Sequence, residues 1–512
     1  MTAPAPAPPA HITPQTPDRP GASLARNAFH LVLGQAGTMV LGILFSAALG
    51  RTLGVGDFGL YFLISSFASF ALVLVDWGQQ FFGIRAVART PERAGELLGT
   101  GLVLRAVGTA LVCIPTGLSA WALGYDRRSI WFAVAFVALN LPLFLAQNFG
   151  VVFRGRDRMG LDATVSVANR FAGLVLALAA LALGLGLGGV VVAQGLAGCA
   201  ALALAAWLYR QVERSPLRFS RTTAREILVG GTALMSMNLA TNVQPYIDAI
   251  LLSELVPKEA VGWYGAAKTL MGTLLAPSLI LGAAAFPRLS RAAGNVEQFH
   301  REMRLADRPM VWLGGLAAVG TWHFAEVAIR IVYGSKGQFA PAGIILGVFG
   351  LGLFLVFVDV LLGTAATALG KATAFSIMKI ATVVLATGLE LVLIPWFQRR
   401  TGNGGIGVVT AFVGCELLVF LGLLTLMPRG TARPVLVDGG RALLSALGTG
   451  ALLHWLPPLS PWLAIPLCIV VFTLLSILSG LVRRHDLHRL RAQFRRDPVE
   501  SPVTPAPGTT LP

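Results

Sequence analysis

Three basic residues, Arg105, Arg170 and Lys268, each lie inside a long run of apolar residues. A basic side chain placed within a membrane costs about 2.5–3.5 kcal/mol on insertion scales, so it calls for an anionic partner or a water-filled cavity. Arg binds a phosphate group through two parallel hydrogen bonds, and Lys binds it as a point charge. The three residues therefore predict an anion-binding site. The alternative is that each side chain carries its charge to the membrane surface, and we favour that alternative for a fourth residue, Lys379.

Acidic residues also fall inside the apolar runs, and they are Asp76, Asp248, Glu326, Asp359, Glu390 and Glu416. A carboxyl group in such a place can carry a proton, bind a coupling cation or form an ion pair with a base. We take Asp76, Asp248 and Asp359 as candidate coupling or ion-pair carboxylates. Glu326 lies near the end of a run and just before Arg330, so for it we predict a surface ion pair.

Other patterns give no sign of catalysis. The seven histidines are scattered, with no His-Glu-x-x-His on a helix, and none of the short outer loops has an acidic pair spaced for a metal. The string 402–407 matches G-x-G-x-x-G but follows no strand, and there is no Walker loop for ATP. The four cysteines all lie in apolar runs without metal or disulfide spacing. We therefore predict no catalytic residue, no metal and no cofactor apart from a coupling ion, either a proton or sodium, and no enzyme activity.

The elements that position these residues are apolar runs of membrane-spanning length. Hydrophobic residues make up 55% of the 512 positions and charged residues only 12%. A helix needs about 20 apolar residues to cross the hydrocarbon core, where only helices and closed barrels satisfy the backbone. We predict an all-α polytopic membrane protein with about 14 transmembrane helices. The predicted spans are 27–50, 60–82, 98–123, 129–153, 164–184, 189–209, 227–253, 261–286, 309–329, 342–368, 375–394, 406–427, 442–456 and 463–482.

The 40 basic residues are distributed unevenly between the two sides of this arrangement. Most lie on one side when the N-terminus is placed inside, including the arginines of segments 210–225 and 288–308. This asymmetry follows the positive-inside rule and indicates contact with anionic membrane lipids, with no role for nucleic acid. We predict a cytoplasmic membrane protein with both termini in the cytoplasm.

The chain divides at its composition changes. The first 22 residues hold seven prolines and no apolar core, and 483–496 has the composition of a basic surface helix. The predicted divisions are a disordered Pro-rich tail at 1–26, a six-helix bundle at 27–209, a basic linker at 210–226, a second six-helix bundle at 227–427, two extra helices at 442–482 and a basic, then Pro-rich, tail at 483–512.

A weak repeat relates the two bundles. Segments 51–61 and 255–264 each read Leu, a turn, an acid and then Gly-x-Tyr, at equivalent places six spans apart. Parallel halves related by an axis along the membrane normal are a known transporter plan. Further short motifs lie at 76–78, 153–156, 246–248, 267–268, 286–291, 333–334 and 368–371.

In the order and spacing of these motifs, the chain resembles the oligosaccharide flippases of the polysaccharide biosynthesis family. That family belongs to the superfamily of multidrug, oligosaccharidyl-lipid and polysaccharide exporters. The resemblance implies two bundles around a central cavity that opens alternately to each side. It also implies the flipping of a polyprenyl-pyrophosphate-linked oligosaccharide from the inner to the outer face of a bacterial cytoplasmic membrane, with a polymerase and glycosyltransferases as candidate partners. In the similar lipid II flippases a basic residue in the region matching Lys268 faces the cavity, although here Thr269 intervenes before Leu270.

Three rival functions remain open at this point. A drug or small-cation antiporter of the same superfamily would call for an acid-rich cavity. A membrane polymerase or ligase would join repeat units instead of moving them. A structural scaffold for a polysaccharide assembly complex would need none of the charges inside the spans.

Overall fold

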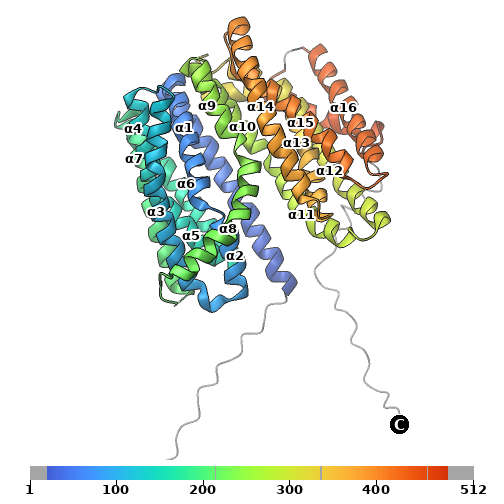
Figure 1. The fold of residues 1–512 in the computed structure, drawn as a ribbon. Helices are drawn as coiled ribbons and strands as arrows, with labels where there is room; N and C mark the ends of the chain where they lie inside the picture. The colour runs from blue at the N-terminus through green and yellow to red at the C-terminus, as the bar shows by residue number, and fades with distance from the viewer. Residues whose placement is uncertain (1–19, 214, 335–336, 458, 483–512) are drawn as a thin grey trace, which may run out of the picture. The chain divides into compact units, whose positions relative to one another are not determined.

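The computed structural model describes residues 20–213, 215–334, 337–457 and 459–482. The predicted C-terminal tail, 483–512, lies outside these residues, as does the predicted N-terminal tail up to residue 19. Within the described ranges the regular elements are helices, with no strand. Figure 1 follows them along the chain.

The chain separates into two compact units. Among the described residues, unit 1 contains 20–45 and 67–238, and unit 2 contains 46–66 and 239–482. The division falls within the first helix, so the segment 46–66 packs with the second half of the sequence. The domain boundaries expected from composition stay predictions.

The first nine α-helices run to the end of the predicted seventh span. They are α1 (Pro20–Asp76), α2 (Gln79–Arg89), α3 (Ala94–Ala122), α4 (Arg127–Leu139), α5 (Leu141–Gly155), α6 (Met159–Ala182), α7 (Gly186–Val212), α8 (Arg221–Asn242) and α9 (Gln244–Leu255), with a short 3-10 helix, η1 (Pro91–Arg93), before α3. The rest are α10 (Lys258–Leu274), α11 (Ala276–Ala292), α12 (Val296–Tyr333), α13 (Ala342–Ala368), α14 (Ala372–Thr401), α15 (Gly405–Leu426), α16 (Ala432–Trp455) and α17 (Pro461–Leu478).

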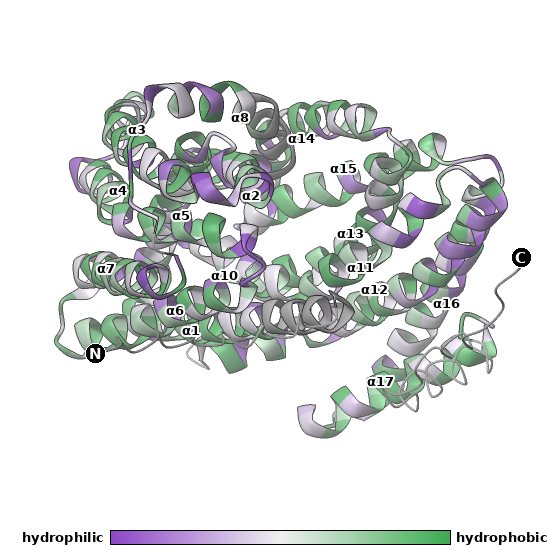
Figure 2. Ribbon diagram, turned by 90° about the horizontal axis from the view of Figure 1, so that it is seen from below, coloured by the Kyte–Doolittle hydropathy of each residue, from purple (hydrophilic) through white to green (hydrophobic). Residues whose placement is uncertain are grey.

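Twelve helical stretches of the described chain are long and apolar enough to cross a membrane. The first stretch, Leu33–Arg89, holds two predicted spans, because Gly54 breaks the helical backbone with φ 77° and ψ 173°. The predicted seventh span, 227–253, is divided between α8 and α9. The all-α polytopic membrane fold is therefore confirmed. Figure 2 shows apolar residues along most of the helices, as expected for helices that meet lipid.

One predicted span differs in length. The thirteenth was expected at 442–456, which is short for a membrane helix, but α16 begins at Ala432 and has 24 residues. The prediction was too short because Asp438 and Arg441 interrupt the apolar run. In the fold these two side chains form an ion pair of 2.9 Å, so their charges are matched within the helix.

Several predicted spans contain a break in the helix, and polar side chains lie beside these breaks. The second span breaks at Trp77 and Gly78, whose φ values are 44° and 72°. The fourth breaks at Asn140, whose side-chain Nδ2 donates to the carbonyl of Phe136 (2.7 Å). Broken helices are tolerated in membranes when other groups satisfy the freed backbone. The carboxylate of Asp76 lies directly before the first of these breaks.

The core of unit 1 is formed by α2, α3, α5 and α7. Leu98, Phe149, Phe153 and Tyr209 are buried there against one another. In unit 2, α13 is the central helix and packs against α10, α11, α12, α14 and α15. Its phenylalanines at 349 and 357 are among the most deeply buried large side chains.

The segment after α7, part of the predicted basic linker 210–226, packs along α3. The Ser220 backbone N–H donates to Thr100 Oγ1 (3.1 Å). Arg156 Nη2 donates to Glu213 Oε2 (2.5 Å), and Ser215 Oγ donates to Glu213 Oε1 (2.7 Å). Burial opposes ionisation of Glu213, but these hydrogen bonds outweigh it and hold the pKa of its carboxyl below its usual value. The linker is thus fixed to unit 1 by matched charges.

The two repeated segments meet inside unit 2. A Cβ atom added to Gly59 would lie 2.8 Å from the backbone nitrogen of Gly262, and one added to Gly262 would lie 2.8 Å from Val55 Cγ2. Both positions therefore need glycine, because real Cβ atoms do not approach neighbours so closely. The Gly-x-Tyr pattern found in both segments marks a close crossing of α1 and α10.

Candidate functional site

A buried polar cluster in unit 2 joins α9, α10 and α14. Its centre is Asp248 on α9, whose side chain is 2% exposed. Gln244, one turn earlier on the same helix, donates from Nε2 to Asp248 Oδ1 (2.6 Å) and to Glu390 Oε1 on α14 (3.1 Å). Side chains four positions apart share a helix face, which is why Gln244 and Asp248 meet. The amide of Gln244 therefore bridges two carboxyl groups.

Lys268 on α10 lies beside the same carboxylate. Its Nζ is 3.8 Å from Asp248 Oδ2, and the hydroxyl of Tyr264, one turn before it, donates to that oxygen (2.8 Å). The ammonium group also faces the rings of Phe349, Phe412 and Tyr264, at 5.3, 5.5 and 5.8 Å from their centroids. Cation–π attraction of this kind is worth about 0.5–2 kcal/mol. Lys268 is thus held by one acid and three aromatic rings, with 20% of its side chain exposed.

The charges of this cluster do not balance. Asp248 and Glu390 are both buried, at 2% and 1% exposure, and Lys268 is their basic neighbour in the described ranges. Glu390 Oε2 has no hydrogen-bond partner among the described residues. An unpaired buried carboxylate is costly, so a proton or a small cation would complete the cluster. Binding of a coupling ion at these carboxylates stays a prediction.

A second buried cluster in unit 2 has the same imbalance. Lys379 Nζ on α14 lies 3.1 and 3.2 Å from the two carboxylate oxygens of Glu416 on α15. Asp359 on α13 is 4% exposed and interacts electrostatically with Glu416, but neither of its carboxylate oxygens has a hydrogen-bond partner in the described part of the chain. For Lys379, the interpretation of a charge reaching the membrane surface is wrong, because an acid on the neighbouring helix holds it.

In unit 1, Arg105 on α3 pairs with Asp76, the last residue of α1. Its other terminal nitrogen donates to the carbonyl of Phe144 on α5 (2.8 Å). Arg105 is 3% exposed, so in this structure its guanidinium group is engaged by protein and closed to a ligand. Beside the pair, the indole Nε1 of Trp77 donates to the carbonyl oxygen of Leu228 on α8 (3.1 Å). A substrate-binding role for Arg105 stays a prediction.

The remaining candidates lie apart from these clusters. Arg170 is exposed on α6, and its substrate-binding role also stays a prediction. Arg330 Nη2 lies 2.7 Å from Glu326 Oε1, and both side chains are more than half exposed. The predicted surface pair of these two residues is confirmed. Within the described ranges, no group of three or more His, Cys, Asp or Glu side chains is placed to hold a metal ion.

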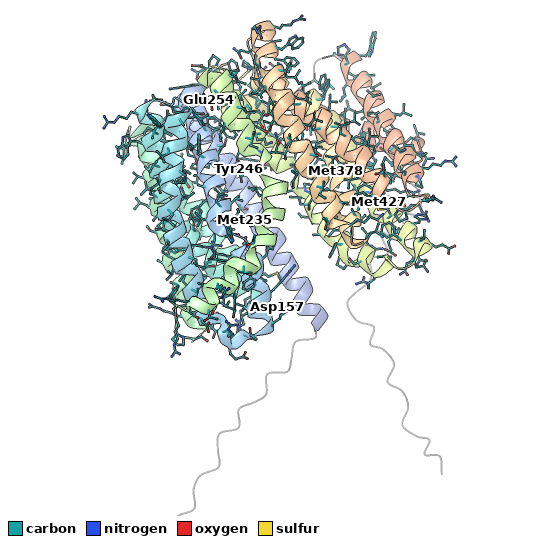
Figure 3. The ribbon with its side chains drawn as sticks, viewed as in Figure 1. Asp157, Met235, Tyr246, Glu254, Met378 and Met427 are labelled. Carbon is teal, nitrogen blue, oxygen red and sulfur yellow. The ribbon has the colours of Figure 1, made fainter. Side chains whose placement is uncertain are left out.

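Gln244 and the partnership of Glu390 with Asp248 were not predicted from the sequence, whereas the Tyr264-x-x-x-Lys268 region was singled out by its resemblance to lipid II flippases. The spacing Gln244-x-x-x-Asp248, repeated as Tyr264-x-x-x-Lys268, was the available signal, because it puts polar pairs on one face of each helix. Figure 3 marks Tyr246 and Glu254 on α9 and Met378 on α14, the helices that carry Asp248 and Glu390.

The chain is similar to known proteins in both sequence and fold. The family model described as polysaccharide biosynthesis protein matches residues 24–293. A relative from Haloferax volcanii, described as a probable low-salt glycan biosynthesis flippase, is 24% identical over 407 residues, which cover 76% of this chain and 80% of the relative.

Solved structures of two transporters share the fold. The lipid II flippase MurJ, in an inward closed conformation, aligns with a TM-score of 0.70 at 13% identity and covers 88% of this chain and 99% of MurJ. An inward-facing multidrug resistance transporter of the MATE family aligns with a TM-score of 0.62 at 18% identity and covers 76% of this chain and 94% of the transporter.

Proposed function

Because the chain belongs to the polysaccharide biosynthesis protein family, we propose that it is a flippase for a polyprenyl-pyrophosphate-linked oligosaccharide. It would move this repeat unit from the inner to the outer face of a bacterial cytoplasmic membrane, with both termini inside. It would break no covalent bond. The observation that carries the proposal is the fold shared with a lipid II flippase over 88% of this chain, together with the family match.

The chemistry of the unit 2 cluster supports this activity. A pyrophosphate head group is an anion, and Lys268 can bind one as a point charge. At 3.8 Å its contact with Asp248 is long, and part of its side chain is exposed. A proton or sodium ion that neutralises Asp248 would release Lys268 for the head group. A cation that binds the inward and outward states with different affinities would shift the equilibrium between them, so an imposed ion gradient could drive the exchange of cation for lipid.

The first experiment examines the lipid pool of cells that depend on this protein. With Lys268→Ala, we expect full-length protein at normal level, single repeat units left facing the cytoplasm, and at least a tenfold loss of exported polymer. Lys371→Ala is the matched control, because Lys371 lies outside the cluster, where its Nζ donates to the carbonyl of Leu426 (2.6 Å). Normal export by Lys268→Ala would remove this residue from the site.

The same assay separates the proposed flippase from a polymerase or ligase. A flippase defect leaves the repeat units unexported, whereas a polymerase defect leaves them exported but unjoined. Repeat units found outside but unjoined in a null strain would therefore contradict the proposal.

One observation favours a second function. Both buried clusters of unit 2 carry more carboxylates than ammonium groups, as a cation-coupled drug antiporter would require, and a MATE transporter shares the fold. The two functions differ in the transported molecule. An antiporter would lower the cellular content of a cationic dye when overproduced, and a flippase would leave that content unchanged.

Ion coupling is tested in vesicles with imposed gradients. We expect lipid-linked oligosaccharide to cross faster when either a pH gradient or a sodium gradient is imposed. A rate that responds to neither gradient would contradict ion coupling but would leave the flippase proposal standing.

A further inference from the structure

A small cavity lies in unit 2 between α12 and the turn that leads into α16. Its volume is about 10 Å³, close to the room that a single water molecule needs. His300, Asp307 and Thr431 are among the residues that line it. The first two lie on α12 and the third directly before α16, so the cavity sits where two helices distant in sequence meet.

Three polar atoms of these residues are buried without a partner. They are His300 Nε2, Asp307 Oδ1 and Thr431 Oγ1, and none has a hydrogen bond within the described ranges. Asp307 and Thr431 are only 2% and 3% exposed. Leaving one such group unsatisfied costs about 1–3 kcal/mol. Three atoms without a hydrogen-bond partner, all on residues that line one cavity, indicate a common ligand.

The charges nearby argue against a metal cation, and the volume of about 10 Å³ leaves no room for a ligand larger than water. Asp438 on α16 is held by Arg308 Nε (3.4 Å) and Arg441 Nη1 (2.9 Å). Together with Asp307 and with Arg304, which also lines the cavity, the region has two carboxylates and three guanidinium groups, so it has no surplus negative charge to hold a metal cation. Imidazole, carboxylate and hydroxyl groups can all bond to one water molecule.

We propose that this cavity binds a single structural water molecule. The water donates one hydrogen bond to Asp307 Oδ1 and one to His300 Nε2, and it accepts one from the Thr431 hydroxyl. Three bonds are the usual number for a buried water. The water thereby fastens the first half of α12 to the start of α16, the first of the two extra helices. This inference does not depend on the proposed transport activity.

The backbone at Gly430 is shaped for this arrangement. Its φ of 92° is a left-handed value that favours glycine. A Cβ atom there would lie 3.3 Å from His300 Cε1 and 3.8 Å from His300 Nε2. The missing side chain leaves room for the imidazole ring next to the water.

The direct experiment is a structure of the full chain at a resolution that shows ordered water. We expect one density peak within about 2.6–3.2 Å of all three atoms. An empty cavity, or a direct bond between His300 and Asp307, would overturn the proposal. A peak with bonds of about 2.0–2.2 Å would indicate a metal ion and would overturn it as well.

A second measurement uses the unfolding temperature of the purified protein. Thr431→Val removes one partner of the water and should lower the unfolding temperature by about 2 °C or more. The matched control is Thr449→Val, because this buried hydroxyl on α16 only donates to the carbonyl of Ser445 in its own helix (2.7 Å). Equal shifts for the two variants would contradict the bridging water, as would stabilisation of the wild type by added Zn²⁺.

Discussion

The pair of Arg105 and Asp76 gives a sharp test of whether a charge inside a span is structural. The guanidinium group lies on α3, bonds to Asp76 and to the carbonyl of Phe144, and its side chain is 4% exposed, against 18% for Asp76. Removing one member of a buried ion pair costs about 3–5 kcal/mol, whereas replacing both members is close to neutral. These values set the expectation for a double-mutant cycle.

We expect an asymmetry between the single variants. Asp76→Asn leaves a deeply buried guanidinium without its carboxylate and should cost about 3–5 kcal/mol of unfolding free energy. Arg105→Met leaves Asp76, which is less deeply buried than Arg105 and can take up a proton, so its cost should be smaller. The double variant should recover much of the loss, with a coupling energy of about 2–3 kcal/mol.

The assay is denaturant unfolding of the purified protein in detergent, with export measured in cells. If the pair is structural, the double variant regains both stability and export. Recovery of stability without export would show that Arg105 or Asp76 has a role in transport beyond holding the fold together. Strictly additive costs of the two substitutions would contradict an ion pair between Arg105 and Asp76, because independent residues show no coupling energy.

Three further predictions concern Glu390, Gly262 and Glu213. Glu390→Gln leaves Asp248 matched by Lys268, so stability should equal or exceed that of the wild type while transport loses its response to an ion gradient; a retained response in vesicles would contradict this. Gly262→Ala should lower the unfolding free energy by about 1–3 kcal/mol through overpacking, whereas Gly272→Ala on the same helix, with nothing within 4 Å, should not. The pKa of the Glu213 carboxyl is lower in the folded protein than in the unfolded chain, so the stability that its ion pair and hydrogen bonds add to the fold is fully present above a pH of about 4.3. This contribution is lost as the pH falls through the lower pKa of the folded state. The stability difference between wild type and Glu213→Gln should therefore shrink between pH 5 and 3 (about the range where a Glu carboxyl titrates), and a difference that stays constant would contradict the assignment.

The sequence predicted the fold because hydrocarbon allows few solutions. Apolar runs of spanning length must become helices, and α13 occupies the predicted 342–368. The breaks at Trp77, Asn140 and Val243 were not predicted, although Gly78, Pro142 and Pro245 follow them within two residues and such residues mark turns.

The candidate site was predicted in part. Asp248 and Lys268 were singled out because charged residues are rare in spans, and the fold brings them together. Their charge partner Glu390 lies far away in sequence, so no spacing rule connects it to Asp248. Lys379 was misread for the same reason, because Glu416 is on another helix.

We propose that this protein carries a lipid-linked, anionic sugar head group across a membrane. The most direct measurement reconstitutes the purified protein in vesicles that contain a polyprenyl-pyrophosphate-linked oligosaccharide and follows the appearance of its sugar on the opposite face with a membrane-impermeant reagent. We expect transfer without ATP that is lost in Lys268→Ala and kept in Lys371→Ala. Transfer no faster than in protein-free vesicles would contradict it.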